Sequence, residues 1–466
     1  MGGIDQVNET RLAPVVANEG NTVENRDGVT RNIPMDAIIN LDHGDPTMYE
    51  AFWEKMGDRC TVEIKGCDSL SYFSNPKNPC WFLEPKLEEA IRSLHGAVGN
   101  AVTDGYSIVV GTGSSHLVNA VLYALTSNHQ TNEPNQISVV SAAPYYSAYP
   151  EIANLVRSGL YKWAGDARQF EKDEPYIELV TSPNNPNGVI QGSVVNRDGG
   201  ILVHDLAYYW PQYTPITSSL EFDIMLFTAS KCTGHAGSRI GWALVKDKEV
   251  AKRMIKFMEV TTIGVSKESQ LRVAKILQFI ADGCKQFGSP QGDNFFEFGQ
   301  SLMKKRWQIL RETLKENQMF TIPKYPLDQH CNFFGDITNA HPGNYFNIIQ
   351  VLLYMVKQTI VPSNISHGIL VTHPIFTEGS LTFTSVVEAF AWMKCKEGIE
   401  DCEKLLRGHK ILARSGRRFG SDPGFVRVSM VGREDEFNLF IDRLSKIQSF
   451  NNDDEKDKAN ASGNLV

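Results

Sequence analysis

The sequence predicts an α/β protein built on a mostly parallel β-sheet, with a large domain and a smaller second domain. Continuous apolar runs alternate with helix-like stretches along the 466 residues, and such runs are typical of parallel strands that are covered on both faces. The length exceeds what one small core usually serves, so we expect two domains. Polar residues follow five of these runs, and ligands of parallel sheets bind at the carboxyl ends of the strands.

The first two predicted strands, residues 106–111 and 137–141, lead into a glycine- and serine-rich turn and an aromatic cluster. The turn Gly111-Thr-Gly-Ser-Ser-His116 opens a helix-like stretch. Glycines and serines at a helix start expose N–H groups and hydroxyls to an anion, although such turns are also common without a ligand. The run from Ala143 to Tyr149 offers rings for stacking, and an aromatic core cluster is the equal alternative.

The next two predicted strands, residues 176–180 and 200–204, end in an amide and a carboxylate. The turn from Ser182 to Gly188 contains two X-Pro steps, and its Asn185 presents an amide able to donate to a phenolic oxygen. Asp205 can hold a pyridine nitrogen protonated, which makes the ring an electron sink. A plain turn and a structural aspartate at a strand end are the alternatives.

A lysine and an arginine follow the fifth predicted strand, residues 224–227. Lys231 lies among small residues, and a buried lysine loses proton affinity and becomes a nucleophile for a carbonyl cofactor. Arg239 adds a rigid fork that suits a phosphate. A lysine for an aldehyde and an arginine for a phosphate indicate pyridoxal phosphate (PLP). A surface lysine at a strand end is the alternative that this segment leaves open.

Composition and the chain ends narrow the class of protein. The net charge of -8 argues against a nucleic-acid or anionic-membrane partner. Eight cysteines without a CxxC pair suggest neither a disulfide scaffold nor a metal site; Cys60 and Cys67 could pair, but we expect free thiols. The N-terminus lacks a secretory signal, so we expect a cytoplasmic protein. Residues 1–33 and 451–466 are predicted to be a disordered arm and tail.

The order of these motifs resembles the fold type I PLP enzymes, the aspartate aminotransferase superfamily. More narrowly, several runs are similar to the plant alliinase and tryptophan aminotransferase-related family, among them Asn40-Leu-Asp-His-Gly-Asp-Pro-Thr47, Cys80-Trp-Phe-Leu-Glu-Pro85 and Thr233-Gly-His-Ala-Gly-Ser-Arg-Ile-Gly-Trp-Ala243. The resemblance implies a segment at 34–85 that joins the small domain, a large PLP-binding domain at 86–300 and a small C-terminal domain at 301–450.

The resemblance also implies a role for each candidate residue around the cofactor. Lys231 would bond to the aldehyde and shuttle protons, and Asp205 would pair with the pyridine nitrogen. Asn185 and Tyr208 would bond the ring oxygen O3′. Tyr146, or alternatively Tyr145, would stack on the ring. The residues expected around the phosphate are Ser115, His116, Thr228, Ser230 and Arg239.

For the substrate, the resemblance implies a carboxylate clamp and a homodimer. Arg427, in a strand-like run from Phe425 to Ser429, would bind the α-carboxylate, and Tyr72 would reach the site of a second copy. The implied reaction moves the amino group of L-tryptophan, or a similar aromatic amino acid, to pyruvate, giving indole-3-pyruvate and alanine for auxin biosynthesis. An alliinase-like cysteine-sulfoxide C–S lyase is the alternative. The pocket residues do not separate the two, and the lack of a cysteine-rich module and secretory signal favours the aminotransferase.

One interruption sets the chain apart from its relatives. Relatives run from a strand like Cys331–Gly335 through a short link into one like Ala389–Trp392, whereas here residues 343–388 intervene. An inserted dimer element or lid is possible, but we favour a retained intron, because Gly343-Asn344 is compatible with codons that contain a splice donor. In that case the product could be inactive. Spliced messages that contain these codons would disprove the idea.

Overall fold

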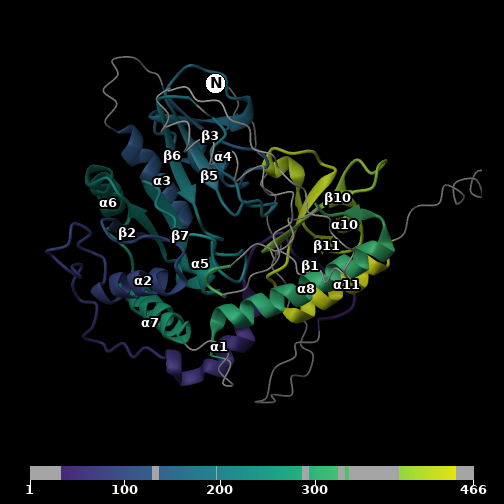
Figure 1. Ribbon diagram of the computed structural model, residues 1–466, viewed down its shortest axis with the longest axis horizontal. Helices are drawn as coiled ribbons and strands as arrows, with labels where there is room; N and C mark the ends of the chain where they lie inside the picture. The colour runs from purple at the N-terminus through teal and green to yellow at the C-terminus, as the bar shows by residue number, and fades with distance from the viewer. Residues whose placement is uncertain are drawn as a thin grey trace, which may run out of the picture.

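The computed structural model describes residues 33–127, 136–195, 197–285, 293–323, 331–334 and 388–447. The predicted tail lies outside these residues, as do the predicted arm except Ile33 and the 343–388 segment except Glu388. Figure 1 shows the large sheet and its helices on one side of the molecule, and a smaller sheet with α10 and α11 on the other.

The large domain is built on a seven-stranded sheet with the order β2-β8-β7-β6-β5-β3-β4. Only β8 runs antiparallel to its neighbours. The five predicted strands are present, each within one residue at either end. The strands are β2 (Ser107–Gly111), β3 (Ile137–Ser141), β4 (Tyr161–Asp166), β5 (Tyr176–Thr181), β6 (Gly200–Asp205), β7 (Ile224–Thr228) and β8 (Gly241–Val245).

The sequence analysis missed two strands of this sheet, for different reasons. Strand β4 is an edge strand that pairs only with β3, and it is mostly half-buried, so its sequence mixes polar and apolar residues. Strand β8 is fully buried but follows directly after the lysine and arginine motif. Its short apolar run was therefore interpreted as part of that motif and not as a strand. In the sheet, β8 lies between β2 and β7.

Helices of the large domain bury one apolar face each. In α2, the residues Leu87, Ile91, Leu94 and Val98 recur at helical spacing and are all buried. The side chain of Asp247 accepts hydrogen bonds from the first turn of α6, which fixes where that helix begins. These helices are α2 (Pro85–Val98), α3 (Ser114–Thr126), α4 (Tyr149–Leu155), α5 (Ala229–Cys232), α6 (Lys248–Thr262) and α7 (Lys267–Gly283).

The small domain joins the two ends of the described chain. Its four-stranded sheet has the order β12-β13-β10-β9, and a separate parallel pair joins β1 to β11. Its strands are β1 (Ile39–Asn40), β9 (Phe320–Thr321), β10 (Phe390–Cys395), β11 (Ile411–Leu412), β12 (Arg414–Ser415) and β13 (Phe425–Ser429). Its helices are α8 (Phe295–Asn317), α10 (Cys402–Gly408) and α11 (Glu434–Ser445). Helix α1 (Glu50–Met56) contacts the large domain through Trp53, whose indole N–H donates to the Thr233 carbonyl.

Two expectations about this region are wrong. The strand predicted at Cys331–Gly335 is reduced in the described part to a single β-bridge residue, Cys331, followed by a turn at residues 332–334. Phe333 packs against Phe296 with ring centroids 5.5 Å apart. Aromatic packing buries Phe333, and the Asn332 N–H donates to the Ile216 carbonyl at 2.7 Å. The expectation of free thiols fails for Cys395 and Cys402, which form a disulfide because the turn between β10 and α10 brings their Cα atoms to 5.8 Å.

The remaining six cysteines, including Cys60 and Cys67, are free thiols. Within the described ranges, no helix is both long enough and apolar enough to cross a membrane. The same residues contain no group of three or more His, Cys, Asp or Glu side chains arranged to hold a metal ion.

Candidate active site

A cavity of about 230 Å³ gathers most of the predicted site residues at the carboxyl ends of β5, β6 and β7. Phe390 of β10 and Arg427 of β13 complete its wall from the small domain. Ten of the twelve candidate residues line it: Ser115, Tyr146, Asn185, Asp205, Tyr208, Thr228, Ser230, Lys231, Arg239 and Arg427.

Lys231 is held on a helix of only four residues that is fixed at both ends. At its start, the Thr228 hydroxyl oxygen accepts from the Ser230 N–H at 3.2 Å. At its end, the fully buried Gln212 amide donates to the carbonyls of Lys231 and Cys232 at 3.2 and 3.1 Å. The Lys231 amine donates to the Gly44 carbonyl. The lysine therefore enters the cavity from a rigid support.

The surroundings of Lys231 favour its neutral form. Burial lowers the pKa of the amine from 10.5 to about 8, and the charges of Arg427 and Arg239 act in the same direction against Asp45. Near neutral pH, a far larger fraction of this amine is unprotonated than in an exposed lysine. Such an amine is a competent nucleophile and base.

The start of α3 forms an anion cradle with Arg239. Gly113 caps the helix with φ of 77° and no side-chain cap, so the first N–H groups of the helix stay open. A Cβ at Gly113 would collide with the Arg239 guanidinium, which packs directly on this glycine. The hydroxyl-bearing residues Ser114, Ser115 and Ser230 line the same cavity. The donor set suits a phosphate group.

Asp205 is a buried carboxylate at the end of β6. Tyr149 donates to one of its oxygens at 2.8 Å, and the Ala207 N–H donates to the other at 3.2 Å. Burial raises the pKa of Asp205, and these two donors oppose the rise. No cation among the described residues pairs with this carboxylate. A protonated ring nitrogen would supply the missing positive charge.

Tyr146 is the aromatic residue of the 143–149 run that lines the cavity. The ring of Tyr145, the alternative candidate, packs against Trp163 with centroids 4.9 Å apart. Tyr149 has a role that the sequence analysis did not foresee, because its hydroxyl holds Asp205 and contacts the Thr181 hydroxyl at 2.7 Å. Tyr208 places its ring 5.9 Å from the Lys231 amine.

Arg427 links the small domain to the turn after β5. Its guanidinium donates to the Asn185 side-chain oxygen at 2.9 Å and to the Asp42 carbonyl, and it lies over the Phe390 ring at 4.1 Å. Burial, followed by the charge of Arg414, lowers the pKa of Arg427 to about 10. Its Nε atom is buried and has no partner among the described residues. The side chain remains a cation with unused donor capacity.

Two predicted residues lie elsewhere. The His116 ring accepts from the Thr112 N–H at 3.3 Å and contacts the Thr261 hydroxyl at 3.1 Å, so its side chain is directed away from the cavity. Tyr72 lies in an irregular stretch before α2 and is 69% exposed. Neither side chain lines the cavity of this chain.

Several residues that line the cavity were not predicted from the sequence, and few of them lie in a recognisable sequence motif. His43 and Gly44 belong to the conspicuous run from Asn40 to Thr47, which carried no site role in the sequence analysis. Arg414 has no local motif at all. The other lining residues that were not assigned are Ser114, Thr181, Ala207, Ala236 and Phe390.

The family model described as allinase matches residues 39–350 and 380–448. The chain belongs to the allinase family. Residues 351–379 fall between the two matched ranges of this family model, inside the segment that the sequence analysis marked as an interruption.

The curated proteins similar to this chain include tryptophan aminotransferase-related proteins and alliin lyases. The chain is 49% identical over 417 residues to tryptophan aminotransferase-related protein 2 of Arabidopsis thaliana, covering 89% of this chain and 82% of that protein. It is 32% identical over 405 residues to alliin lyase of Allium cepa var. aggregatum, covering 85% of this chain and 79% of the lyase.

Solved structures establish the wider fold. The aspartate aminotransferase from Thermus thermophilus with maleate superposes with a TM-score of 0.55 at 16% identity, covering 88% of this chain and 91% of that one. A tetra mutant of the Thermus thermophilus enzyme complexed with tryptophan gives a TM-score of 0.54 at 16% identity, with the same coverage. This allinase family protein therefore has the fold of the fold type I PLP enzymes.

PLP is the cofactor of this allinase family protein, and the cavity fits it. Arg239 and the α3 start offer a phosphate cradle, Lys231 an amine for the aldehyde, and Asp205 an unpaired carboxylate for the ring nitrogen. The side-chain amide N–H groups of Asn185 remain available to donate to the ring oxygen, because among the described residues only its side-chain oxygen is engaged. The chemistry of this donor set matches each polar group of PLP.

Proposed function

We propose that this protein is a PLP-dependent aminotransferase that moves the amino group of L-tryptophan, or a similar aromatic amino acid, to pyruvate, giving indole-3-pyruvate and alanine for auxin biosynthesis. The observation that carries the chemistry is the meeting of Lys231, Asp205 and Arg427 in one cavity. The substrate class is supported by 49% identity to a tryptophan aminotransferase-related protein, against 32% to an alliin lyase.

When bound, PLP supplies an aldehyde that takes the amino group and a ring that withdraws electrons from the substrate Cα. Asp205 would hold the proton of the ring nitrogen, and Tyr149 keeps that carboxylate in place. The Lys231 amine, with its lowered pKa, would remove the proton from the substrate Cα. Gln212 and Thr228 fix the helix that carries this amine, so the base stays aligned.

Arg427 would bind the α-carboxylate of the amino acid and of the oxo acid. A buried guanidinium is a rigid bidentate donor, and its free Nε gives it capacity beyond its contacts to Asn185 and Asp42. The rings of Tyr146, Tyr208 and Phe390 line the same cavity and offer apolar surface to an aromatic side chain. These features favour tryptophan or a similar amino acid.

A cysteine-sulfoxide lyase is the second candidate, because the identity to alliin lyase extends over 85% of this chain. Both reactions begin with removal of the Cα proton by the same lysine. They differ in the next step, in which a lyase expels the sulfur substituent on Cβ. A direct product assay decides between them.

The experiment uses the purified, PLP-loaded full chain. Incubation with tryptophan and pyruvate should yield indole-3-pyruvate and alanine in equal amounts, measured by liquid chromatography and mass spectrometry. Lys231→Ala should abolish both products and the visible absorbance band. Pyruvate and ammonia from a cysteine sulfoxide, without transamination of tryptophan, would establish the lyase instead. A folded protein that takes up PLP and does neither would support the inactive, retained-intron product.

A further inference from the structure

A second arginine, Arg414, lines the cavity beside Arg427. The two residues are directly opposite each other in the antiparallel pair β12–β13. Opposed residues of such a pair project from the same face of the sheet, with Cβ atoms about 4.5–5.5 Å apart. The cavity therefore has two guanidinium groups on one wall, whereas a monocarboxylic amino acid needs only one.

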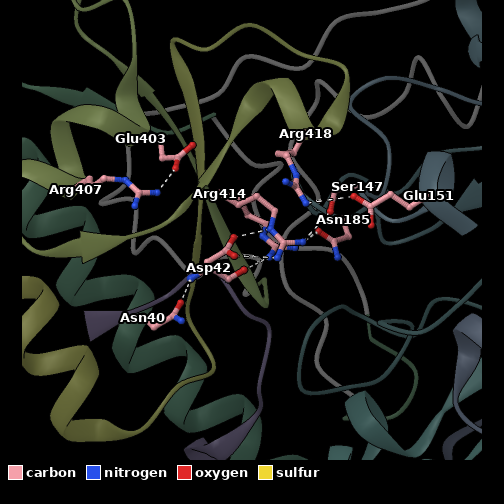
Figure 2. A network of polar contacts seen from close by, with 10 residues as sticks. Asn40, Asp42, Ser147, Glu151, Asn185, Glu403, Arg407, Arg414 and Arg418 are labelled. Carbon is pink, nitrogen blue, oxygen red and sulfur yellow. Dashed lines mark hydrogen bonds and ion pairs between the residues drawn. The ribbon is translucent and has the colours of Figure 1, made fainter. Parts of the chain in front are cut away.

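Each of the three guanidinium nitrogens of Arg414 donates a hydrogen bond to a neighbouring side chain. Its Nε and Nη2 atoms donate to the two carboxylate oxygens of Asp42 at 2.5 and 3.0 Å, and Nη1 donates to the Ser147 hydroxyl at 2.9 Å. Figure 2 shows the Asp42 carboxylate facing Arg414, with Ser147 and Asn185 on the other side. Both charged side chains are largely buried, with 18% and 29% exposed for Arg414 and Asp42.

The Asp42 carboxylate remains ionised in this position. Burial raises the pKa of Asp42, but the hydrogen bond and charge of Arg414, together with the charge of Arg427, outweigh it and leave the pKa below 3.8. The pair therefore contributes no net charge to the cavity at neutral pH. Arg427 pairs with no carboxylate in the described part of the chain; its guanidinium donates to the main-chain carbonyl of Asp42 and to the Asn185 side-chain oxygen.

We propose that Asp42 sets the substrate class by neutralising Arg414, so that the cavity accepts monocarboxylic amino and oxo acids and rejects dicarboxylic ones. A second substrate carboxylate near Arg414 would meet the Asp42 carboxylate and no free cation. Rejection through an unfavourable charge is a common source of specificity. Without the Asp42 charge, Arg414 and Arg427 together would form a site for two carboxylates. This inference rests on the proposed aminotransferase function.

The test removes the charge and keeps the main chain. In Asp42→Asn the carbonyl that Arg427 contacts is retained, while Arg414 becomes an unneutralised cation. With the PLP-loaded protein, we expect succinate to bind at least about tenfold more tightly, measured by calorimetry, and aspartate with 2-oxoglutarate to be transaminated about tenfold faster relative to tryptophan with pyruvate. Asp42→Ser provides a second variant if the asparagine does not fold.

Two controls separate the local charge from general effects. Adding Arg414→Leu to Asp42→Asn should remove the gain, because the freed cation is then absent. Glu50→Gln is the matched control, since Glu50 forms a bidentate pair with Arg433 at 2.6 and 2.8 Å between the same two parts of the chain, and neither residue lines the cavity. It should leave succinate binding unchanged.

The outcomes distinguish this inference from the proposed function. If the unaltered protein transaminates tryptophan but Asp42→Asn binds succinate no better, the inference is overturned and the aminotransferase stands. If the unaltered protein does not transaminate tryptophan but Asp42→Asn gains succinate binding that Arg414→Leu removes, the aminotransferase falls and the role of Asp42 stands. A gain that persists without Arg414 also overturns the inference.

Discussion

Lys231 is a buried amine in a site rich in positive charge. Burial and the nearby charges of Arg427 and Arg239 lower its pKa to about 8. A base with a lowered pKa becomes neutral at lower pH, so the apoprotein should bond PLP at a rate that rises with pH through about 8 and then levels off. For an exposed lysine, the rate of bonding to PLP would continue to rise up to about pH 10.4.

Absorbance after PLP is added to the apoprotein measures this rate, with N-acetyl-lysine as the reference amine. Arg427→Met should move the midpoint upward, because it removes the second-largest cause of the lowered pKa. A midpoint that coincides with that of the reference amine would contradict the proposed environment of Lys231.

Glu388 is a buried carboxylate that pairs with no cation among the described residues. It is 4% exposed, and burial alone raises its pKa well above 4.5. Its carboxylate occupies the space next to Gly188, where any Cβ would collide with it. The ionised form of Glu388 is therefore disfavoured in the folded protein.

We therefore predict that Glu388→Gln stabilises the protein. Because the folded-state pKa is raised, the folded chain binds the proton more tightly, and its stability falls as pH rises above about 4.5. The variant should therefore be more stable than the unaltered protein at about pH 8, and the difference should shrink toward about pH 5. Urea unfolding at about pH 5 and pH 8 measures this.

Glu178→Gln is the contrasting variant. Glu178 is also buried, but it accepts from the N–H groups of Val194 and Val195 at 2.8 and 3.2 Å. Burial raises the pKa of Glu178 as well, but these two donors oppose the rise, so Glu178→Gln should stabilise the protein less than Glu388→Gln does. Equal gains in stability from both variants would show that burial of a glutamate determines its energetic cost, whether or not the carboxylate has hydrogen-bond partners.

At the scale of elements, the sequence predicted what local patterns can encode. Five buried strands were found from their apolar runs, and the polar residues after them meet in the cavity, because parallel strands end at one edge. The Asp42–Arg414 pair was not predictable in this way. These residues are 372 positions apart. A local sequence pattern does not indicate a contact that forms only when two distant segments of the chain pair.

The start of α3 provides a prediction for an element. Gly113 and Gly105 both have positive φ, 77° and 80°, but a Cβ at Gly113 would strike Arg239 whereas one at Gly105 would meet nothing within 4 Å. Both alanine variants carry backbone strain, of roughly 1 kcal/mol or more. Only Gly113→Ala should weaken PLP binding, by about tenfold or more, in a fluorescence titration of the apoprotein. Similar losses in both variants would exclude a specific cradle.

At the scale of the whole molecule, we propose that the protein is a homodimer, as the family resemblance implies, and a complementation test can check this. Tyr72 is exposed and lies outside the cavity of its own chain. If it acts in the site of a second copy, Lys231→Ala and Tyr72→Ala should each be weakly active or inactive, yet regain activity when they are mixed after dissociation. In a mixed dimer, one site has both an intact lysine and an intact tyrosine.

Light scattering would give the oligomeric state of each sample in that test. A monomeric, active protein would contradict the proposed dimer. If dimers form but mixing restores nothing, Tyr72 does not act across the interface, and its exposure needs another explanation.

The pairing of β1 with β11 has a consequence for synthesis on the ribosome. Ile39 emerges early but must wait for Ile411 before its strand can pair. The large domain needs no such delay, because β2 to β8 and α2 to α7 are continuous in the chain and can fold as they emerge. Gly113, Asp205 and Lys231 are therefore in place before Arg427 has been made. We expect a nascent chain to capture its cofactor while it is still unable to hold a substrate.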